Sequence, residues 1–93
     1  MATSQQRPKR VIKNRKSPLT PADARFLKRV GLKISSDLYK DAHPVEWLAF
    51  RVNIARSSIR EIIAGRSNPR LLTLRAIAEG LGYKSLIEFL NSI

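Results

Sequence analysis

Residues 45–64, VEWLAFRVNIARSSIREIIA, contain two short apolar patterns separated by an asparagine. In the first pattern, apolar residues recur at the spacing of one helix face, which predicts a helix over 44–52. Asn53 is expected to end this helix, because asparagine tolerates the left-handed backbone conformation of a tight helix stop. The second pattern predicts a helix over about 56–64, closed by Gly65.

The residue types at the expected crossing of these two helices suit close packing. Small Ala49 lies where the helices would touch, and Ile59 and Ile62 would hold the second helix against the first. A turn of about three residues joins the two segments. We therefore predict a helix-turn-helix over 45–64.

Three further helices are predicted around this pair. The first begins at Thr20, a good N-cap, with Pro21 at the first helical position, and ends near residue 40. Gly31 lowers the helix propensity of its middle and leaves a kink open there. The expected apolar stripe of this helix consists of Phe26, Val30, Ile34 and Leu38, with Leu27 beside them. The others span about 72–81 and 85–92, so residues 19–93 are expected to form one all-α domain of five helices.

The charge is strongly positive, at +11 over 93 residues. Nucleic acid is therefore the favoured partner, and an anionic membrane surface is the second candidate. Residues 1–16 contain no acidic residue. Their basic residues are Arg7, Lys9, Arg10, Lys13, Arg15 and Lys16.

The segment 1–18 has too little apolar content to fold alone, and we predict that it is a disordered basic arm. Three roles are open for it. It could enter a groove of DNA or wrap the duplex, add non-specific affinity by releasing counterions, or serve as a targeting signal. The first two together are favoured.

Several function classes lack the residues they need. The chain has no cysteine and a single histidine, His43, which rules out thiol chemistry and a metal site built on histidine or cysteine. No glycine-rich phosphate loop is present, and the apolar runs are too short to span a bilayer. We expect no enzyme activity, metal or cofactor, and we interpret His43 as a helix-start or phosphate-facing residue.

The order of motifs after residue 47 is distinctive. It consists of LA at 48–49, RSSI at 56–59, Gly65, NP at 68–69, LLTL at 71–74, IA at 77–78 and LG at 81–82. This order resembles the Cro/CI, or lambda-repressor-like (XRE), helix-turn-helix family, although Asn53 stands where the family usually has glycine. The resemblance implies the five-helix lambda-repressor-like fold, with the helix over 56–64 in the major groove of DNA.

The resemblance also implies which residues contact bases. They are Arg56, Ser57, Arg60 and Glu61. The two arginines are four residues apart and share one helix face, opposite the isoleucines. Arginine can bind guanine O6 and N7 together, and Glu61 could accept from cytosine N4. The alternative is that Arg60 and Glu61 are only solvated surface residues.

Backbone phosphates need donors that fix position without distinguishing bases. The start of the helix over 44–52 offers the N–H groups of Val45 and Glu46. The other expected phosphate contacts are Ser58, Arg66, Ser67, Asn68 and Arg70. For Asn68 and Pro69, turn chemistry alone is the alternative.

Two apolar groups are candidate dimer or partner surfaces. The first is Trp47 and Phe50, three residues apart, which would mark a protein partner site if exposed and would belong to the core if covered by another helix. The second is the C-terminal group of Tyr83, Phe89, Leu90 and Ile93. For Phe89, a plain core role is the alternative.

Together these features predict a small bacterial or phage transcriptional regulator, such as a repressor, that binds double-stranded DNA as a homodimer and acts in the cytoplasm at the nucleoid. Its operator would be pseudo-palindromic. One alternative is an antitoxin that also covers a toxin, and another is an architectural protein that binds DNA without sequence preference. A toxin or polymerase is the expected kind of protein partner.

Overall fold

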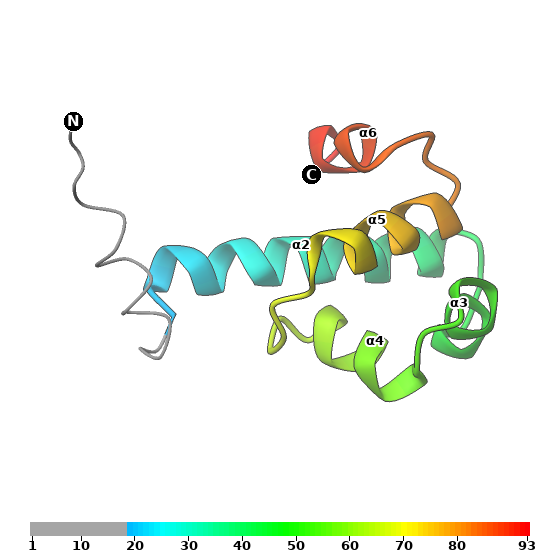
Figure 1. Ribbon diagram of the computed structural model, residues 1–93, viewed down its shortest axis with the longest axis horizontal. Helices are drawn as coiled ribbons and strands as arrows, with labels where there is room; N and C mark the ends of the chain where they lie inside the picture. The colour runs from blue at the N-terminus through cyan, green and yellow to red at the C-terminus, as the bar shows by residue number, and fades with distance from the viewer. Residues whose placement is uncertain (1–18) are drawn as a thin grey trace.

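The computed structural model describes residues 19–93, which form five α-helices and contain no strand. These helices are α2 (Pro21–Lys40), α3 (Val45–Val52), α4 (Arg56–Ile63), α5 (Leu71–Gly80) and α6 (Leu86–Asn91). α2 packs against α4, α3 against both α4 and α5, and α5 against α6 (Figure 1). The all-α, five-helix prediction is confirmed for this part of the chain. The predicted basic arm, 1–18, lies outside the described residues.

The start of α2 is fixed by a reciprocal cap. The Asp23 backbone N–H donates to Thr20 Oγ1 at 3.0 Å, and the Thr20 N–H donates to Asp23 Oδ2 at 3.2 Å. Pro21 occupies the first turn, where its missing N–H removes no helical hydrogen bond. The predicted helix start is confirmed, and so is its end at Lys40.

α2 continues without a break through Gly31, so the kink that the sequence left open does not form. A Cβ atom at this position would lie 2.7 Å from the carbonyl oxygen of Ile62 and would also collide with the carbonyl of Ile63. Gly31 is therefore required for the close approach of α2 to the end of α4.

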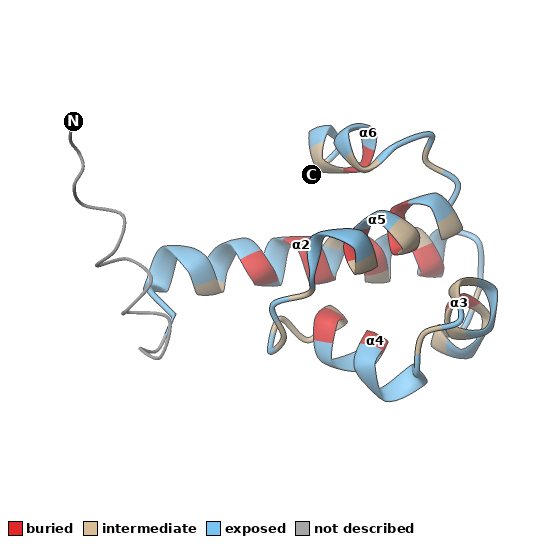
Figure 2. Ribbon diagram, in the orientation of Figure 1, coloured by how far each residue is buried: buried red, intermediate tan, exposed pale blue. Residues whose placement is uncertain are grey.

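The core lies where the helices face one another (Figure 2). Its buried members are Val30, Ile34, Leu38, Leu48, Ile59, Ile62, Leu74, Ile77, Ala78 and Phe89. One predicted stripe residue is wrong: Phe26 is 50% exposed, whereas its neighbour Leu27 is 9% exposed. The reason is that a spacing of four residues drifts around the helix by about 40° per step, so Phe26 lies off the face on which Leu27, Val30, Ile34 and Leu38 are buried.

The turn between α3 and α4 follows the sequence prediction. Asn53 adopts the left-handed conformation, with φ 58° and ψ 45°, and its N–H donates to the Ala49 carbonyl oxygen. Gly65, after α4, also has a positive φ of 77°. The short left-handed stop at Asn53 lets the chain change direction within three residues and begin α4 at Arg56.

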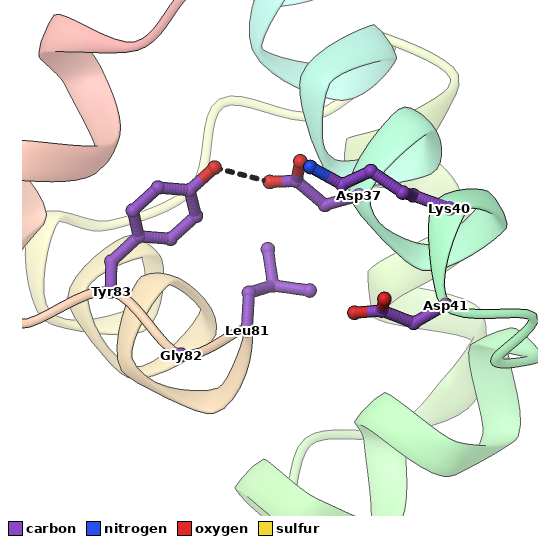
Figure 3. Close-up of a pocket in the computed structure, with 6 residues that line it drawn as sticks. All are labelled: Asp37, Lys40, Asp41, Leu81, Gly82 and Tyr83. Carbon is purple, nitrogen blue, oxygen red and sulfur yellow. Dashed lines mark hydrogen bonds between the residues drawn. The ribbon is translucent and has the colours of Figure 1, made fainter.

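A polar contact connects the α5–α6 loop to α2. The Tyr83 hydroxyl donates to Asp37 Oδ2 at 2.6 Å, across a pocket of about 230 Å³ (Figure 3). The Tyr83 ring also meets Phe89 edge to face, with centroids 5.2 Å apart. Phe89 is completely buried, so it belongs to the core and not to a partner surface, which corrects that assignment.

Candidate nucleic-acid interface

The four predicted base-contacting residues, Arg56, Ser57, Arg60 and Glu61, are all exposed on α4. We call this set the outer face of α4. On the opposite side of the helix, Ile59 is completely buried and Ile62 is 4% exposed. The apolar side thus anchors α4 to the body, and the polar side is left accessible to a partner.

Arg56 and Arg60 converge on one carboxylate, that of Glu46 in the first turn of α3. Arg60 Nη2 lies 2.8 Å from Glu46 Oε2, and Arg56 Nη1 lies 3.3 Å from the same oxygen. The sequence prediction had assigned Glu46 only a backbone N–H contact to phosphate. Its side-chain role was missed because the partners are 10 and 14 residues away, and their meeting depends on how α3 crosses α4.

The Glu46 carboxylate is held in its charged form. Its pKa is lowered first by a hydrogen bond to its own backbone N–H, and then by the positive charges of Arg60 and Arg56. All three side chains remain about half exposed, at 48% for Glu46, 56% for Arg60 and 61% for Arg56. Exposed ion pairs of this kind contribute little to folding stability because solvent screens them.

A second ion pair involves the C-terminal half of α4. Arg66 donates from Nε to Glu61 Oε1 at 3.0 Å and from Nη2 to Glu61 Oε2 at 2.9 Å. Hydrogen bonding to Arg66 lowers the pKa of Glu61, and the same contact raises the pKa of Arg66. A predicted base contact and a predicted phosphate contact are therefore paired with each other.

The predicted phosphate contacts surround α4. Ser58, Arg66, Asn68 and Arg70 are exposed, and Ser67 is half-buried. Both α3 and α4 begin without a side-chain cap, so their first N–H groups are not satisfied by a capping side chain. The first of these helix starts contains Val45 and Glu46, but the Glu46 N–H is hydrogen-bonded to its own carboxylate, so Val45 has the more accessible N–H for a phosphate.

The structure separates the two aromatic residues of α3. The Trp47 ring is half-buried and stacks on His43, with centroids 3.6 Å apart and planes 2° apart, and the Arg51 guanidinium carbon lies 5.3 Å from the Trp47 ring centroid. Phe50, in contrast, is 91% exposed. Of this pair, only Phe50 has the full exposure that a partner surface needs, and His43 is a stacking residue.

Tyr83, Leu90 and Ile93 lie half-buried against the core. The most exposed apolar residue of α6 is one that the sequence analysis did not select, Ile87, at 70%. The exposure of Ile87 could have been predicted from the sequence. At about 100° per residue, Ile87 points away from the side of the helix that Leu86 and Phe89 share.

Other kinds of site are not supported by the described residues. Within 19–93, no three histidine, cysteine, aspartate or glutamate side chains lie close enough to hold a metal ion. In the pocket of Figure 3, Asp37 is already bound by Tyr83 and by Lys33, whose Nζ is 3.4 Å away. None of the helices in this part of the chain is both long and apolar enough to cross a membrane.

A comparison with protein families matches the segment of the chain that contains α3, α4 and α5. A family model described as helix-turn-helix matches residues 47–89, from the first turn of α3 into α6. The matched segment includes the turn at Asn53 and the whole outer face of α4. No curated protein and no solved structure matches the chain.

Proposed function

Residues 47–89 belong to the Cro/CI-type (XRE) helix-turn-helix family of DNA-binding transcription regulators, and from this premise we propose that the protein binds a specific sequence of double-stranded DNA through α4. The α4 helix would lie in the major groove, which is wide enough to admit a helix. The bound protein would regulate transcription, for example by occupying a promoter, and would act in the cytoplasm at the nucleoid.

The observation that carries this proposal is the division of α4 into two faces. On one face Ile59 is completely buried, and the other face carries two exposed arginines one helical turn apart. A guanidinium can donate two hydrogen bonds to guanine O6 and N7, a pattern that other bases do not offer in the major groove. Arg56 and Arg60 are therefore the residues that we propose contact bases.

The residues around α4 support a matching phosphate surface. The Val45 N–H at the start of α3, together with the exposed side chains of Ser58, Arg66, Asn68 and Arg70, can bind phosphate on either side of the groove. The basic residues of 1–16 add positive charge to the same chain. We propose that they increase affinity for any duplex through counterion release.

We further propose that the protein binds as a homodimer. Exposed Ile87, with half-buried Leu90 and Ile93, gives the C-terminal end an apolar surface that a second copy could cover. Two copies related by a twofold axis would contact half-sites about 34–36 Å apart. A pseudo-palindromic preferred site would then follow from the symmetry of the protein.

Selection of binding sites from a random duplex pool, followed by Arg60→Ala, tests the proposal. We expect a defined site, and we expect the substitution to cost roughly 1–3 kcal/mol on that site and to relax the base preference at one position. Arg75→Ala is the control, because Arg75 is an equally exposed arginine paired with Glu79 on α5. Equal weakening on all sequences would contradict the assignment of Arg60.

The same selection distinguishes the other two candidate functions. An architectural protein would bind selected and random duplexes with nearly equal affinity, because its contacts would be to phosphates. An antitoxin would bind its operator and also a protein, for which fully exposed Phe50 on α3 is the available apolar contact. Phe50→Ala would then abolish protein binding and leave duplex affinity unchanged.

A further inference from the structure

The carboxylate of Glu46 lies against the two arginines of the proposed DNA-binding surface, which is an unexpected position for a negative charge. Its Oε2 atom accepts hydrogen bonds from both Arg56 and Arg60, the two proposed base-contacting arginines. A nearby DNA phosphate would be repelled by this carboxylate. An acidic residue that only weakened DNA binding would oppose the function of the surface. Its effects on binding to random sequence and on binding to a specific sequence are therefore different.

Non-specific binding depends on uncompensated positive charge. Each cation that neutralises a phosphate releases counterions and adds affinity for any sequence. With Glu46 between them, Arg56 and Arg60 contribute a net charge of about one rather than two to this attraction. The carboxylate therefore weakens binding to random sequence.

Specific binding depends on the direction of the arginine donors. A guanidinium carries five N–H donors in a fixed plane. In the structure Arg60 contacts Glu46 through Nη2 and Arg56 contacts it through Nη1. Each guanidinium thus keeps enough donors for the two acceptors of guanine, while the shared carboxylate restricts the rotation of both long side chains. Less conformational entropy is then lost when the guanine contacts form.

We propose that Glu46 determines sequence specificity by positioning Arg56 and Arg60 and by removing part of their charge from non-specific attraction to phosphate. This inference rests on the proposed function. Glu46 acts through the arginines and does not itself contact a base, so it is a positioning residue. A role in stability alone is a poor explanation, since half-exposed ion pairs contribute little to folding.

The test compares Glu46→Gln with Glu79→Gln in the full chain. Both substitutions remove one negative charge from a carboxylate that accepts from arginine and is about half exposed, but Glu79 lies on α5 and pairs with Arg75. Affinity is measured for the selected duplex and for a random duplex of equal length over a range of salt concentrations. Thermal unfolding checks that each variant is folded.

We expect Glu46→Gln to bind random duplex roughly three- to tenfold more tightly and the selected duplex by a smaller factor, so that the ratio of the two affinities falls. The salt dependence of random-duplex binding should steepen by up to about 0.9 in the logarithmic slope, which corresponds to one more neutralised phosphate. Glu79→Gln should change both affinities by the same small factor. Glu46→Asp, which keeps the charge on a shorter side chain, should keep random-duplex affinity near that of the unchanged protein.

Two different failures can be distinguished. If the unchanged chain binds no duplex even in dilute buffer, the proposed function is wrong and the role of Glu46 falls with it. If the unchanged chain binds a defined site but Glu46→Gln and Glu79→Gln alter the affinity ratio equally, the proposed function stands and the inference about Glu46 is overturned.

Discussion

The two ends of α4 are held in different ways. At its C-terminal end, the carbonyl groups of Ile62 and Ile63 lie so close to Gly31 that no methyl group could be inserted. Arg56, at its N-terminal end, and Arg60, one turn later, are connected to α3 through ion pairs that are about half exposed to solvent. One end is fixed by packing, and the other by ion pairs that solvent screens and that contribute little to stability.

This difference separates the residues that orient α4 from those that we propose contact DNA. Interiors are packed like crystals, so a change of one carbon atom at the Gly31 contact must move backbone. Exposed ion pairs tolerate change because solvent compensates for their loss. The direction of the helix and the chemistry of its outer face can therefore vary independently. A substitution at the Gly31 contact should mainly lower stability, and a substitution of Arg56 or Arg60 should mainly lower DNA binding.

The largest effect is expected for Gly31→Ala. Overpacking against the backbone of α4 costs about 3 kcal/mol, and the higher helix propensity of alanine recovers about 1 kcal/mol, so the free energy of unfolding should fall by about 2 kcal/mol. Urea denaturation measures this change. Ser36→Ala, at an exposed position of the same helix, is the control and should change stability by less than about 0.5 kcal/mol. Equal stability of the two variants would mean that the close contact is not maintained in solution.

Gly31 also shows where prediction from sequence stops. Helix propensity is a local property, and it suggested a kink. The actual reason for the glycine is a contact with Ile62 and Ile63, more than 30 positions away, which depends on the crossing of two helices. The error at Phe26 has a local cause: a strict spacing of four residues drifts around a helix of 3.6 residues per turn, and Leu27, not Phe26, lies on the buried face.

Local rules were sufficient elsewhere. The cap at Thr20 and the stop at Asn53 were predicted because both depend on the conformation of a few consecutive residues. The exposure of Arg60 followed from the burial of Ile59 and Ile62 on the other side of α4. The side-chain partner of Arg60 did not follow, since Glu46 belongs to another helix.

The second largest effect is expected at the turn between α3 and α4. Alanine in the left-handed conformation of Asn53 is strained, so Asn53→Ala should lower the free energy of unfolding by about 1 kcal/mol. Asn53→Gly should change it little, because glycine adopts this conformation without strain but loses more entropy on folding. Denaturation of both variants checks the prediction. A loss of stability in the glycine variant as large as that in the alanine variant would show that the asparagine side chain, and not the backbone angle, is important.

A smaller effect on stability is expected when both arginines are removed. The double substitution Arg56→Ala and Arg60→Ala deletes two exposed ion pairs, and the free energy of unfolding should change by less than about 0.5 kcal/mol. The same variant should lose preferential binding to the selected duplex. If the free energy of unfolding fell by about 2 kcal/mol or more, the arginine ion pairs would be as important to the fold as the Gly31 contact. The proposed difference between the two ends of α4 would then be wrong.

The smallest effect is in the titration of the two glutamates that form ion pairs around α4, Glu46 on α3 and Glu61 on α4. Glu46 and Glu61 should both titrate below the ordinary glutamate value of 4.5. A pKa lowered by folding means that each group stabilises the folded protein above that ordinary value, and that this contribution is lost as the pH falls through the lowered pKa. NMR of the side-chain carboxyl groups measures both values.

Arginine variants distinguish the causes of these two shifts. Arg66→Ala should return Glu61 to its ordinary range, because hydrogen bonding to Arg66 is the main cause of its lowered pKa. Arg60→Ala should raise the pKa of Glu46 only in part, because the largest cause there is the hydrogen bond to its own backbone N–H, which the substitution leaves in place. Full recovery of Glu46 in that variant would mean that its charge is maintained by the arginines alone, and Glu46 would then be less firmly positioned at the start of α3 than its backbone contact implies.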